Sequence, residues 1–356
     1  MTSLIIPLIL SGGSGSRLWP VSTQEKPKPY LHFGADQSLF QQTIQRCQQP
    51  VFDPRPIVVA STSHRPLLHA DLSICGVSAD IILEPEGRDS CAATLAGAML
   101  ALQRDPNALL LMLAADHHIP DVEAFAKAVE TAKPQAEAGH LVSFGIQPKM
   151  PATGYGYILP EHPIAAGELA PVQRFAEKPD IATAQDYVKA GYLWNSGNLL
   201  FRAAAFVVEA QHLAPQLFAS VAIALWKSRR DKHECQLDRQ AYARVPRISV
   251  DYAILEKTRK AWVMAVDYDW SDIGTWDAVA RLHQSDDAGN ICCGNAKVVG
   301  GRNNFVYAQD RLTVLSEVDG LSVVATRDTV LVTRKGAGEA VKNLPPMLES
   351  ANKLTE

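Results

Sequence analysis

Residues 5–20 read IIPLILSGGSGSRLWP, an apolar run that changes abruptly into a Gly-rich stretch. The apolar run, Ile5 to Leu10, is typical of a buried strand. Glycine adopts positive φ and lets an anion approach the backbone, so a strand followed by such a turn can direct several N–H groups at a phosphate. Arg17 and Lys28 add positive charge close by. The start of the chain therefore predicts a polyphosphate-binding site.

The two common phosphate motifs do not fit this stretch. A P-loop requires a Gly-Lys-Ser/Thr sequence, which the chain lacks. A dinucleotide fingerprint that begins at Gly13 would need glycine at the position of Leu18. The pattern that remains is Gly-Gly-x-Gly-Ser-Arg-Leu-x-Pro followed by the Pro27-Lys28 pair. It resembles the sugar-nucleotidyltransferases, which join a nucleoside triphosphate to a sugar 1-phosphate.

Length, charge and cysteine usage narrow the class of protein. The chain has 356 residues, which suggests two domains, and a net charge of -4, which argues against nonspecific nucleic-acid binding. Its six cysteines show no C-x-x-C spacing, so we expect reduced thiols. We find no export signal and no apolar stretch near the roughly 20 residues that cross a bilayer. These features predict a cytoplasmic protein with no membrane partner.

Strand and helix patterns alternate in the first half of the chain. Apolar runs at 57–60, 108–114 and 141–144 predict strands, and the patterns at 92–102 and 122–132 predict helices. This alternation indicates an α/β fold with a Rossmann-like, mainly parallel, mixed sheet. Ligands of such sheets bind at the carboxyl ends of the strands. The Gly-rich loop and Asp116 both follow a predicted strand.

The remainder of the chain predicts two helical stretches, 182–190 and 203–226, and then a change of composition near residue 286. Beyond that point short Val-rich runs stand between Gly, Asn and Asp, at 297–299, 312–315, 321–325 and 329–333. We therefore expect a nucleotidyltransferase catalytic domain over 1–285 and a small β-rich C-terminal domain over 286–356.

Two carboxylates are candidate metal ligands. Asp116 follows an apolar strand, and Asp272 lies in the turn Trp270-Ser271-Asp272-Ile273-Gly274. Mg²⁺ usually takes one or two protein carboxylates and completes its shell with water and phosphates, so this pair suits Mg²⁺. His117 and His118 have no further His or Cys ligands nearby in sequence, which argues against zinc. No nucleophile motif is present either, which favours direct in-line displacement.

Further segments make the resemblance more specific, and together they cover nearly all of the first 280 residues. They read EPEGRDS at 84–90, TGYGY at 153–157, FAEKP at 175–179, WNSGN at 194–198 and SVDYAILEK at 249–257. This ordered set is similar to the bacterial mannose-1-phosphate guanylyltransferase family.

The resemblance implies a function, a cofactor and a set of site residues. It implies transfer of GMP from GTP to alpha-D-mannose 1-phosphate, giving GDP-mannose and pyrophosphate, with Mg²⁺ on Asp116 and Asp272. The catalytic residues it implies are Arg17, Lys28, Asp116 and Asp272. The nucleotide-binding residues it implies are Leu10, Gly12, Gly13, Gly15, Ser16, Arg17, Lys28, Glu84 and Arg88. The sugar-phosphate residues it implies are Gly154, Tyr155, Glu177, Lys178 and Asn195. The oligomeric state stays open: the β-rich C-terminal domain either packs on the catalytic domain or mediates oligomerisation, for example as a homodimer.

Three departures from the family pattern affect these assignments. The chain has Asp89 where the family usually has Asn, Pro29 where it has Gln, and Ala115 where Pro commonly stands. Asp89 bears on the base pocket, because a carboxylate accepts hydrogen bonds and an amide also donates them. The sequence leaves no room for the additional isomerase domain of some family members, so we expect a single activity.

Two other functions stay open at this point. One is a nucleotidyltransferase of the same fold with another sugar 1-phosphate or base. The other is a catalytically silent regulatory subunit that binds GDP-mannose. Such a subunit would be expected to have lost a metal carboxylate or the loop Arg or Lys, and all four groups are present.

Overall fold

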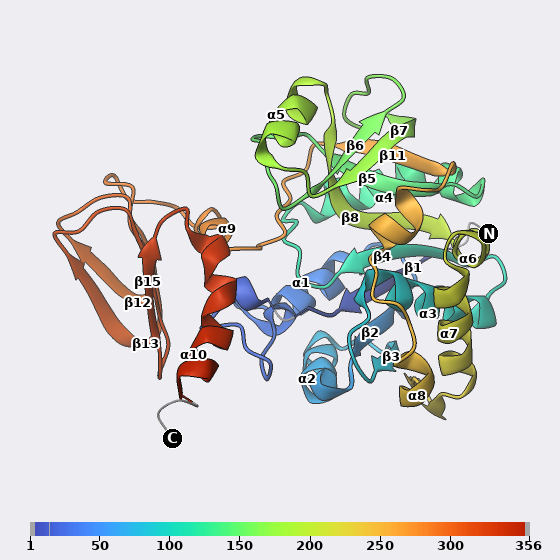
Figure 1. Cartoon of the computed structure of the whole chain (residues 1–356), viewed down its shortest axis with the longest axis horizontal. Helices are drawn as coiled ribbons and strands as arrows, with labels where there is room; N and C mark the ends of the chain where they lie inside the picture. Colours follow the sequence, from blue (N-terminus) through green and yellow to red (C-terminus); the bar gives the residue numbers. More distant parts are fainter. Residues whose placement is uncertain (1–3, 14, 353–356) are drawn as a thin grey trace. The chain divides into compact units, whose positions relative to one another are not determined.

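The computed structural model describes residues 4–13 and 15–352 of the chain (Figure 1). It divides into two compact units, each built from segments that are distant in sequence. The first unit comprises residues 1–12, 41–115 and 119–270, and the second comprises 13–40, 116–118 and 271–356. The predicted domain boundary at 285/286 stays a prediction.

The first unit contains an 11-stranded mixed sheet. Its strands are β1 (Ile5–Ser11), β2 (Ile57–Ser61), β3 (Asp80–Glu84), β4 (Leu109–Ala114), β5 (Leu141–Ile146), β6 (Gly156–Pro160), β7 (Leu169–Glu177), β8 (Leu193–Arg202), β9 (Arg229–Asp231), β10 (Glu234–Gln236) and β11 (Ala261–Val266). The strand order is β5-β11-β7-β6-β8-β4-β1-β2-β3-β10-β9. Pairing is parallel among β3, β2, β1 and β4, whereas β8 runs antiparallel to β4, β5 and β6. The expected α/β fold is thus confirmed as a mixed α/β fold.

Helices accompany this sheet along the chain. They are α1 (Leu39–Arg46), which begins in the second unit, α2 (Arg65–Cys75), α3 (Asp89–Arg104), α4 (Val122–Glu137), α5 (Ile181–Lys189), α6 (Ala203–Leu213), α7 (Pro215–Trp226) and α8 (Arg239–Tyr242), with the 3-10 helix η3 (Thr62–His64) and the π-helix η4 (Asp251–Leu255). Of these, α3, α4 and α5 lie where the sequence predicts helices, whereas α1, α2 and α8 were not predicted. Figure 1 shows α3 beside α6 and α7, against which it packs. The single helix expected over 203–226 is wrong: Ala214 ends α6, and Pro215 starts α7 at a first-turn position, where its missing N–H costs nothing.

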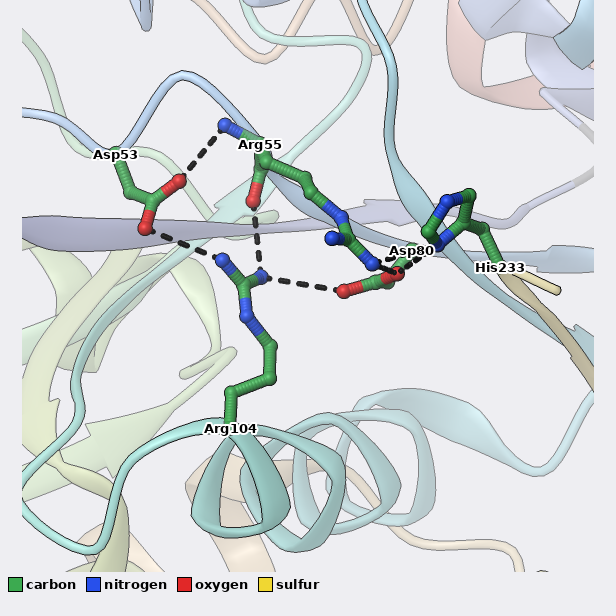
Figure 2. A network of polar contacts seen from close by, with 5 residues as sticks. All are labelled: Asp53, Arg55, Asp80, Arg104 and His233. Atoms are coloured by element: carbon green, nitrogen blue, oxygen red, sulfur yellow. Dashed lines mark hydrogen bonds and ion pairs between the residues drawn. The ribbon is translucent and has the colours of Figure 1, made fainter.

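A network of charged side chains lies where β2 and β3 begin (Figure 2). Asp80, the first residue of β3, pairs with Arg55 and, at 3.4 Å, with Arg104 at the end of α3. Arg104 also pairs with Asp53 at 3.1 Å, and His233 Nδ1 lies 3.2 Å from Asp80. The predicted site residues Leu10 and Glu84 lie at the other, carboxyl, ends of their strands, away from this network. Since Arg104 ends α3, the network holds α3 against the sheet and is not part of the predicted site.

The second unit contains a four-stranded sheet of order β12-β13-β14-β15. Its elements are η1 (Ser16–Leu18), η2 (Lys28–Tyr30), α9 (Trp276–Ala280), β12 (Ile291–Val299), β13 (Phe305–Ser316), β14 (Leu321–Ala325), β15 (Val330–Arg334), η5 (Gly338–Asn343) and α10 (Leu344–Asn352). The chain after 286 therefore forms the expected strands but ends in η5 and α10 rather than in further β structure. Pro345 and Pro346 stand in the first turn of α10, where backbone N–H groups have no intrahelical partner and proline is tolerated.

In the core of the second unit, residues from the first loop pack against residues from the C-terminal region. Trp276 is 1% exposed, and its indole N–H donates to the Trp19 carbonyl at 3.0 Å. Leu18, Phe305 and Val341 belong to the same buried cluster. Within residues 4–13 and 15–352, none of the helices combines the length and apolarity needed to cross a bilayer.

Candidate active site

The Gly-rich loop follows β1 and leads into η1. Leu10 pairs within the sheet of the first unit, Gly12 is exposed, and Gly13 has a φ of +97°. Gly15, with a φ of +58°, is left-handed at the N-cap of η1, just before the exposed Ser16. A Cβ at Gly15 would lie 2.6 Å from both Lys28 Cβ and Ser22 Oγ. The backbone here needs glycine, because the loop packs directly on Lys28.

Lys28 contacts both predicted metal-ligand residues in the second unit, one through its carboxylate and the other through its backbone carbonyl. Its Nζ pairs with Asp116 Oδ2 at 2.9 Å and donates to the backbone carbonyl of Asp272. Hydrogen bonds in both directions between His118 and Ser271, of 2.9 and 3.0 Å, bring these two distant segments together. The structure thus unites residues that the sequence places at opposite ends of the chain.

A pocket of about 320 Å³ lies at this point of the second unit. All four residues predicted to be catalytic line it, together with Gly15 and Ser16; the four are Arg17, Lys28, Asp116 and Asp272. Arg17 Nε pairs with Glu339 Oε2 at 3.0 Å. The pocket therefore combines positive groups suited to phosphate oxygens with carboxylates suited to a cation.

The charges in this pocket favour an ionised Asp116. Burial opposes ionisation of this carboxyl, but the Lys28 ammonium and His117 outweigh that effect, so the pKa of Asp116 lies below its ordinary value. Asp116 is therefore a carboxylate at neutral pH, as a metal ligand has to be.

The donor set fits Mg²⁺. The Lys28 ammonium already lies between a carboxylate and a carbonyl oxygen, which shows that the site accepts a cation on oxygen donors. The Gly274 N–H donates to Asp272 Oδ1 at 3.1 Å, and Ile273 between them is fully buried with a φ of +44°. Such a conformation is unusual for a β-branched residue, so packing fixes the turn that presents Asp272. Asp116 and Asp272 are the residues that would hold the ion.

The two residues predicted on the base side lie together in the first unit. Glu84 ends β3 and is 8% exposed, and the Tyr242 hydroxyl donates to its Oε1. Arg88 donates to the carbonyl of Ala243 at 2.6 Å and pairs with Glu86 at 2.9 Å. Tyr242 carries no motif, so sequence reasoning missed it.

The backbone conformation at Asp89 explains why an aspartate is accepted at this position. Its φ is +68°, its side chain is exposed, and its Oδ1 accepts the N–H of Ser90 at 2.8 Å. Asn and Asp are the side chains that tolerate the left-handed region best after glycine. Replacement of the family's Asn by Asp therefore preserves the local conformation.

The environment of Glu84 predicts that the free energy of unfolding depends on pH. Burial raises the pKa of its carboxyl to about 7, although the Tyr242 hydrogen bond opposes the shift. Between the ordinary value of 4.5 and about 7, the folded state keeps a proton that the unfolded state has released. The free energy of unfolding should therefore fall as pH rises through this range, by roughly 3 kcal/mol at most.

Denaturant unfolding at pH 5 and pH 7.5 measures this effect. Glu84→Gln should remove most of the fall, because the amide does not ionise. Glu161 is exposed, so the stability of Glu161→Gln should depend on pH as that of the wild type does. Equal pH dependence in Glu84→Gln and wild type would show that Glu84 is already ionised at low pH.

The residues predicted on the sugar-phosphate side also lie together in the first unit. The Lys178 N–H donates to the Tyr155 carbonyl at 3.2 Å, and the Lys178 ammonium pairs with Glu177. The Tyr155 ring lies edge-on to Trp194, 5.1 Å between centroids, and Asn195 follows in the same strand. Gly154 is exposed, with open space where a side chain would lie.

Asp251 is a further member of this cluster. Asn195 Nδ2 donates to Asp251 Oδ1 at 2.9 Å. Burial and the nearby Glu177 raise the pKa of the Asp251 carboxyl to about 6, against the effect of Lys178. Asp251 lies in the segment 249–257, which belongs to the set that carries the family resemblance, although the motif alone does not indicate a role for this carboxylate.

Comparison with known protein families identifies the class of protein to which this mixed α/β fold belongs. Residues 6–289 match the family model described as "Nucleotidyl transferase". This range includes the Gly-rich loop and both carboxylates, and the chain belongs to the nucleotidyl transferase family.

Individual proteins similar to this chain indicate a more specific group within that family. A mannose-1-phosphate guanylyltransferase of Escherichia coli is 38% identical over 356 residues, which cover 98% of this chain and 74% of that protein. The xanthan biosynthesis protein XanB of Xanthomonas campestris is 39% identical over 351 residues, covering 98% and 74%. A Thermus thermophilus structure, described as a mannose-1-phosphate geranyltransferase, is 30% identical with a TM-score of 0.84 and covers 98% of this chain and 100% of that one. The resemblance read from the motifs is confirmed.

Proposed function

We propose that this chain transfers GMP from GTP to alpha-D-mannose 1-phosphate and releases GDP-mannose and pyrophosphate. The pocket that Arg17, Lys28, Asp116 and Asp272 share is the observation that carries the reaction type. The choice of substrates rests on the relatives named mannose-1-phosphate guanylyltransferase, which are 37–38% identical to this chain.

The reaction needs positioning and charge rather than a nucleophilic side chain. A phosphate monoester is largely a dianion at neutral pH, so its oxygen attacks the α-phosphorus of GTP without a general base. That bond forms as the bond from the α-phosphorus to the oxygen bridging to the β-phosphate breaks, and pyrophosphate leaves with the electron pair. Arg17 and Lys28 stabilise the charge that develops on the leaving group. Mg²⁺, when bound by Asp116 and Asp272, would neutralise phosphate charge.

The loop backbone and the base-side residues orient the nucleotide. Gly12, Gly13, Gly15 and Ser16 bring the backbone close to the phosphates, and Leu10 fixes the strand that precedes them. Glu84 and Arg88 lie toward the guanine, with Tyr242 holding the Glu84 carboxyl. The sugar phosphate is bound by Gly154, Tyr155, Glu177, Lys178 and Asn195. A cytoplasmic location stays a prediction, and the oligomeric state stays open.

Replacement of Asp251 by alanine tests the sugar side. It should raise the KM for mannose 1-phosphate about 10-fold, because Asn195 loses the acceptor that orients its amide. The KM for GTP should stay within about twofold, since Asp251 belongs to the sugar-side cluster. Initial rates with each substrate varied in turn measure both constants. An unchanged KM for mannose 1-phosphate would remove Asp251 from this side.

A substrate matrix tests the function as a whole. Pyrophosphate release is measured with GTP, ATP, UTP and dTTP against mannose, glucose and heptose 1-phosphates, all with Mg²⁺. We expect the highest kcat/KM for GTP with mannose 1-phosphate. Turnover of another pair would favour a relative with a different sugar or base. Binding of GDP-mannose without any turnover would favour the silent regulatory subunit.

A further inference from the structure

The segment after β15 lies against the Gly-rich loop within the second unit. In η5, Val341 is 2% exposed and joins the buried cluster that contains Leu18 of η1 and Trp276. Just before η5, the Gly336 N–H donates to Asp277 Oδ1 at 2.9 Å. Packing and this hydrogen bond hold η5 beside η1.

η5 carries one charged side chain that lines the pocket and a second that pairs with a pocket residue. Lys342 lines the same pocket as Arg17 and Lys28. Glu339 Oε2 pairs with Arg17 Nε at 3.0 Å and with Lys342 Nζ at 3.8 Å. One carboxylate oxygen therefore faces two cations of a pocket that is suited to an anion.

The exposure of these groups distinguishes them from the Lys28 pair. The side chains of Glu339 and Lys342 are 60% and 48% exposed, and that of Arg17 is 35% exposed. Lys28 and Asp116, by contrast, are only 8% and 20% exposed. Solvated ion pairs are weak and exchange partners readily. A polyphosphate of high charge can thus displace Glu339 from Arg17 more easily than it can separate Lys28 from Asp116.

We propose that Lys342 is a polyphosphate-binding residue of this pocket and that Glu339 is a carboxylate that occupies Arg17 until the polyphosphate arrives. The inference rests on the proposed function, which makes the polyphosphate that of a nucleoside triphosphate or the departing pyrophosphate. Lys342 supplies a mobile point charge, whereas the guanidinium of Arg17 suits two oxygens at once. The C-terminal segment thereby completes a site that begins in the first loop.

Binding of inorganic tripolyphosphate to the full chain with Mg²⁺, measured by calorimetry, tests the proposal. Lys342→Met should weaken binding about 10-fold, because a charge-assisted contact is lost. Lys342→Arg should retain most of the affinity. Glu339→Gln should bind several-fold more tightly, because the competing charge is gone. Lys335→Met is the control. Lys335 lies on the same unit, where its ammonium donates to Asn303, and its replacement should leave tripolyphosphate binding as in the wild type.

Two results would overturn the proposal. Equal affinities of Lys342→Met and Lys335→Met would remove Lys342 from the site. Weaker binding by Glu339→Gln would mean that Glu339 positions Arg17 for the anion and does not compete with it. Because tripolyphosphate binding requires no turnover, these results stand even if GTP and mannose 1-phosphate do not react. A failure of Lys342→Met to weaken binding leaves the proposed function intact.

Discussion

Asp272→Asn is expected to reduce kcat by at least about 100-fold, because the change removes one of two charges that would hold Mg²⁺. The fold should survive, since the asparagine Oδ1 can still accept the hydrogen bond that Gly274 N–H donates to Asp272. Steady-state rates over a Mg²⁺ titration, together with thermal unfolding, measure the two effects separately. The variant should need more Mg²⁺ for the activity it retains.

Asp269→Asn is the matched control. This neighbouring aspartate is exposed and pairs with Lys149 at 3.0 Å, so its change should leave kcat and the Mg²⁺ requirement as they are. A wild-type kcat in Asp272→Asn would contradict the metal assignment. A loss of folding cooperativity in Asp272→Asn would instead reveal a structural role for the carboxylate charge.

Gly15→Ala should lower kcat/KM by about 100-fold or more. The new Cβ would lie 2.6 Å from Lys28 Cβ, so either the loop or Lys28 has to move. Lys28 holds both Asp116 and the Asp272 carbonyl, and small displacements in such a site have large effects on rate. The left-handed backbone adds a cost of about 1–2 kcal/mol in stability. Initial rates and denaturant unfolding measure both.

Gly76→Ala separates these two costs. Gly76 has a similar φ of +64°, with open space where a Cβ would lie. It should therefore lose comparable stability and keep the wild-type kcat/KM. If Gly15→Ala and Gly76→Ala lose the same activity, global destabilisation explains both, and the contact between loop and Lys28 has no specific role.

Local patterns predicted much of the first unit and of the pocket. Apolar runs identified β1 and β4, because strands of a covered parallel sheet are apolar throughout. Asp116 was found because it directly follows β4. The break at Pro215 was overlooked because α6 and α7 are similarly apolar on either side of it.

Contacts between distant segments could not be predicted. Nothing local connects Arg17 to Glu339, and both are ordinary surface residue types. Likewise, Tyr242 gives no sign in the sequence that its hydroxyl meets Glu84. Such partners are set by the topology, which one sequence taken alone does not reveal.

The buried cluster shared by Leu18, Phe305, Val324 and Val341 has a genetic consequence. A stop codon soon after Asp286 would leave Arg17, Lys28, Asp116 and Asp272 in the translated product, although it would remove Lys342. It would also remove the apolar side chains against which Leu18 and Trp276 pack. Such an allele would keep all the sequence motifs of the catalytic site. We nevertheless expect its product to be inactive, because the loop that carries Arg17 loses its packing partners.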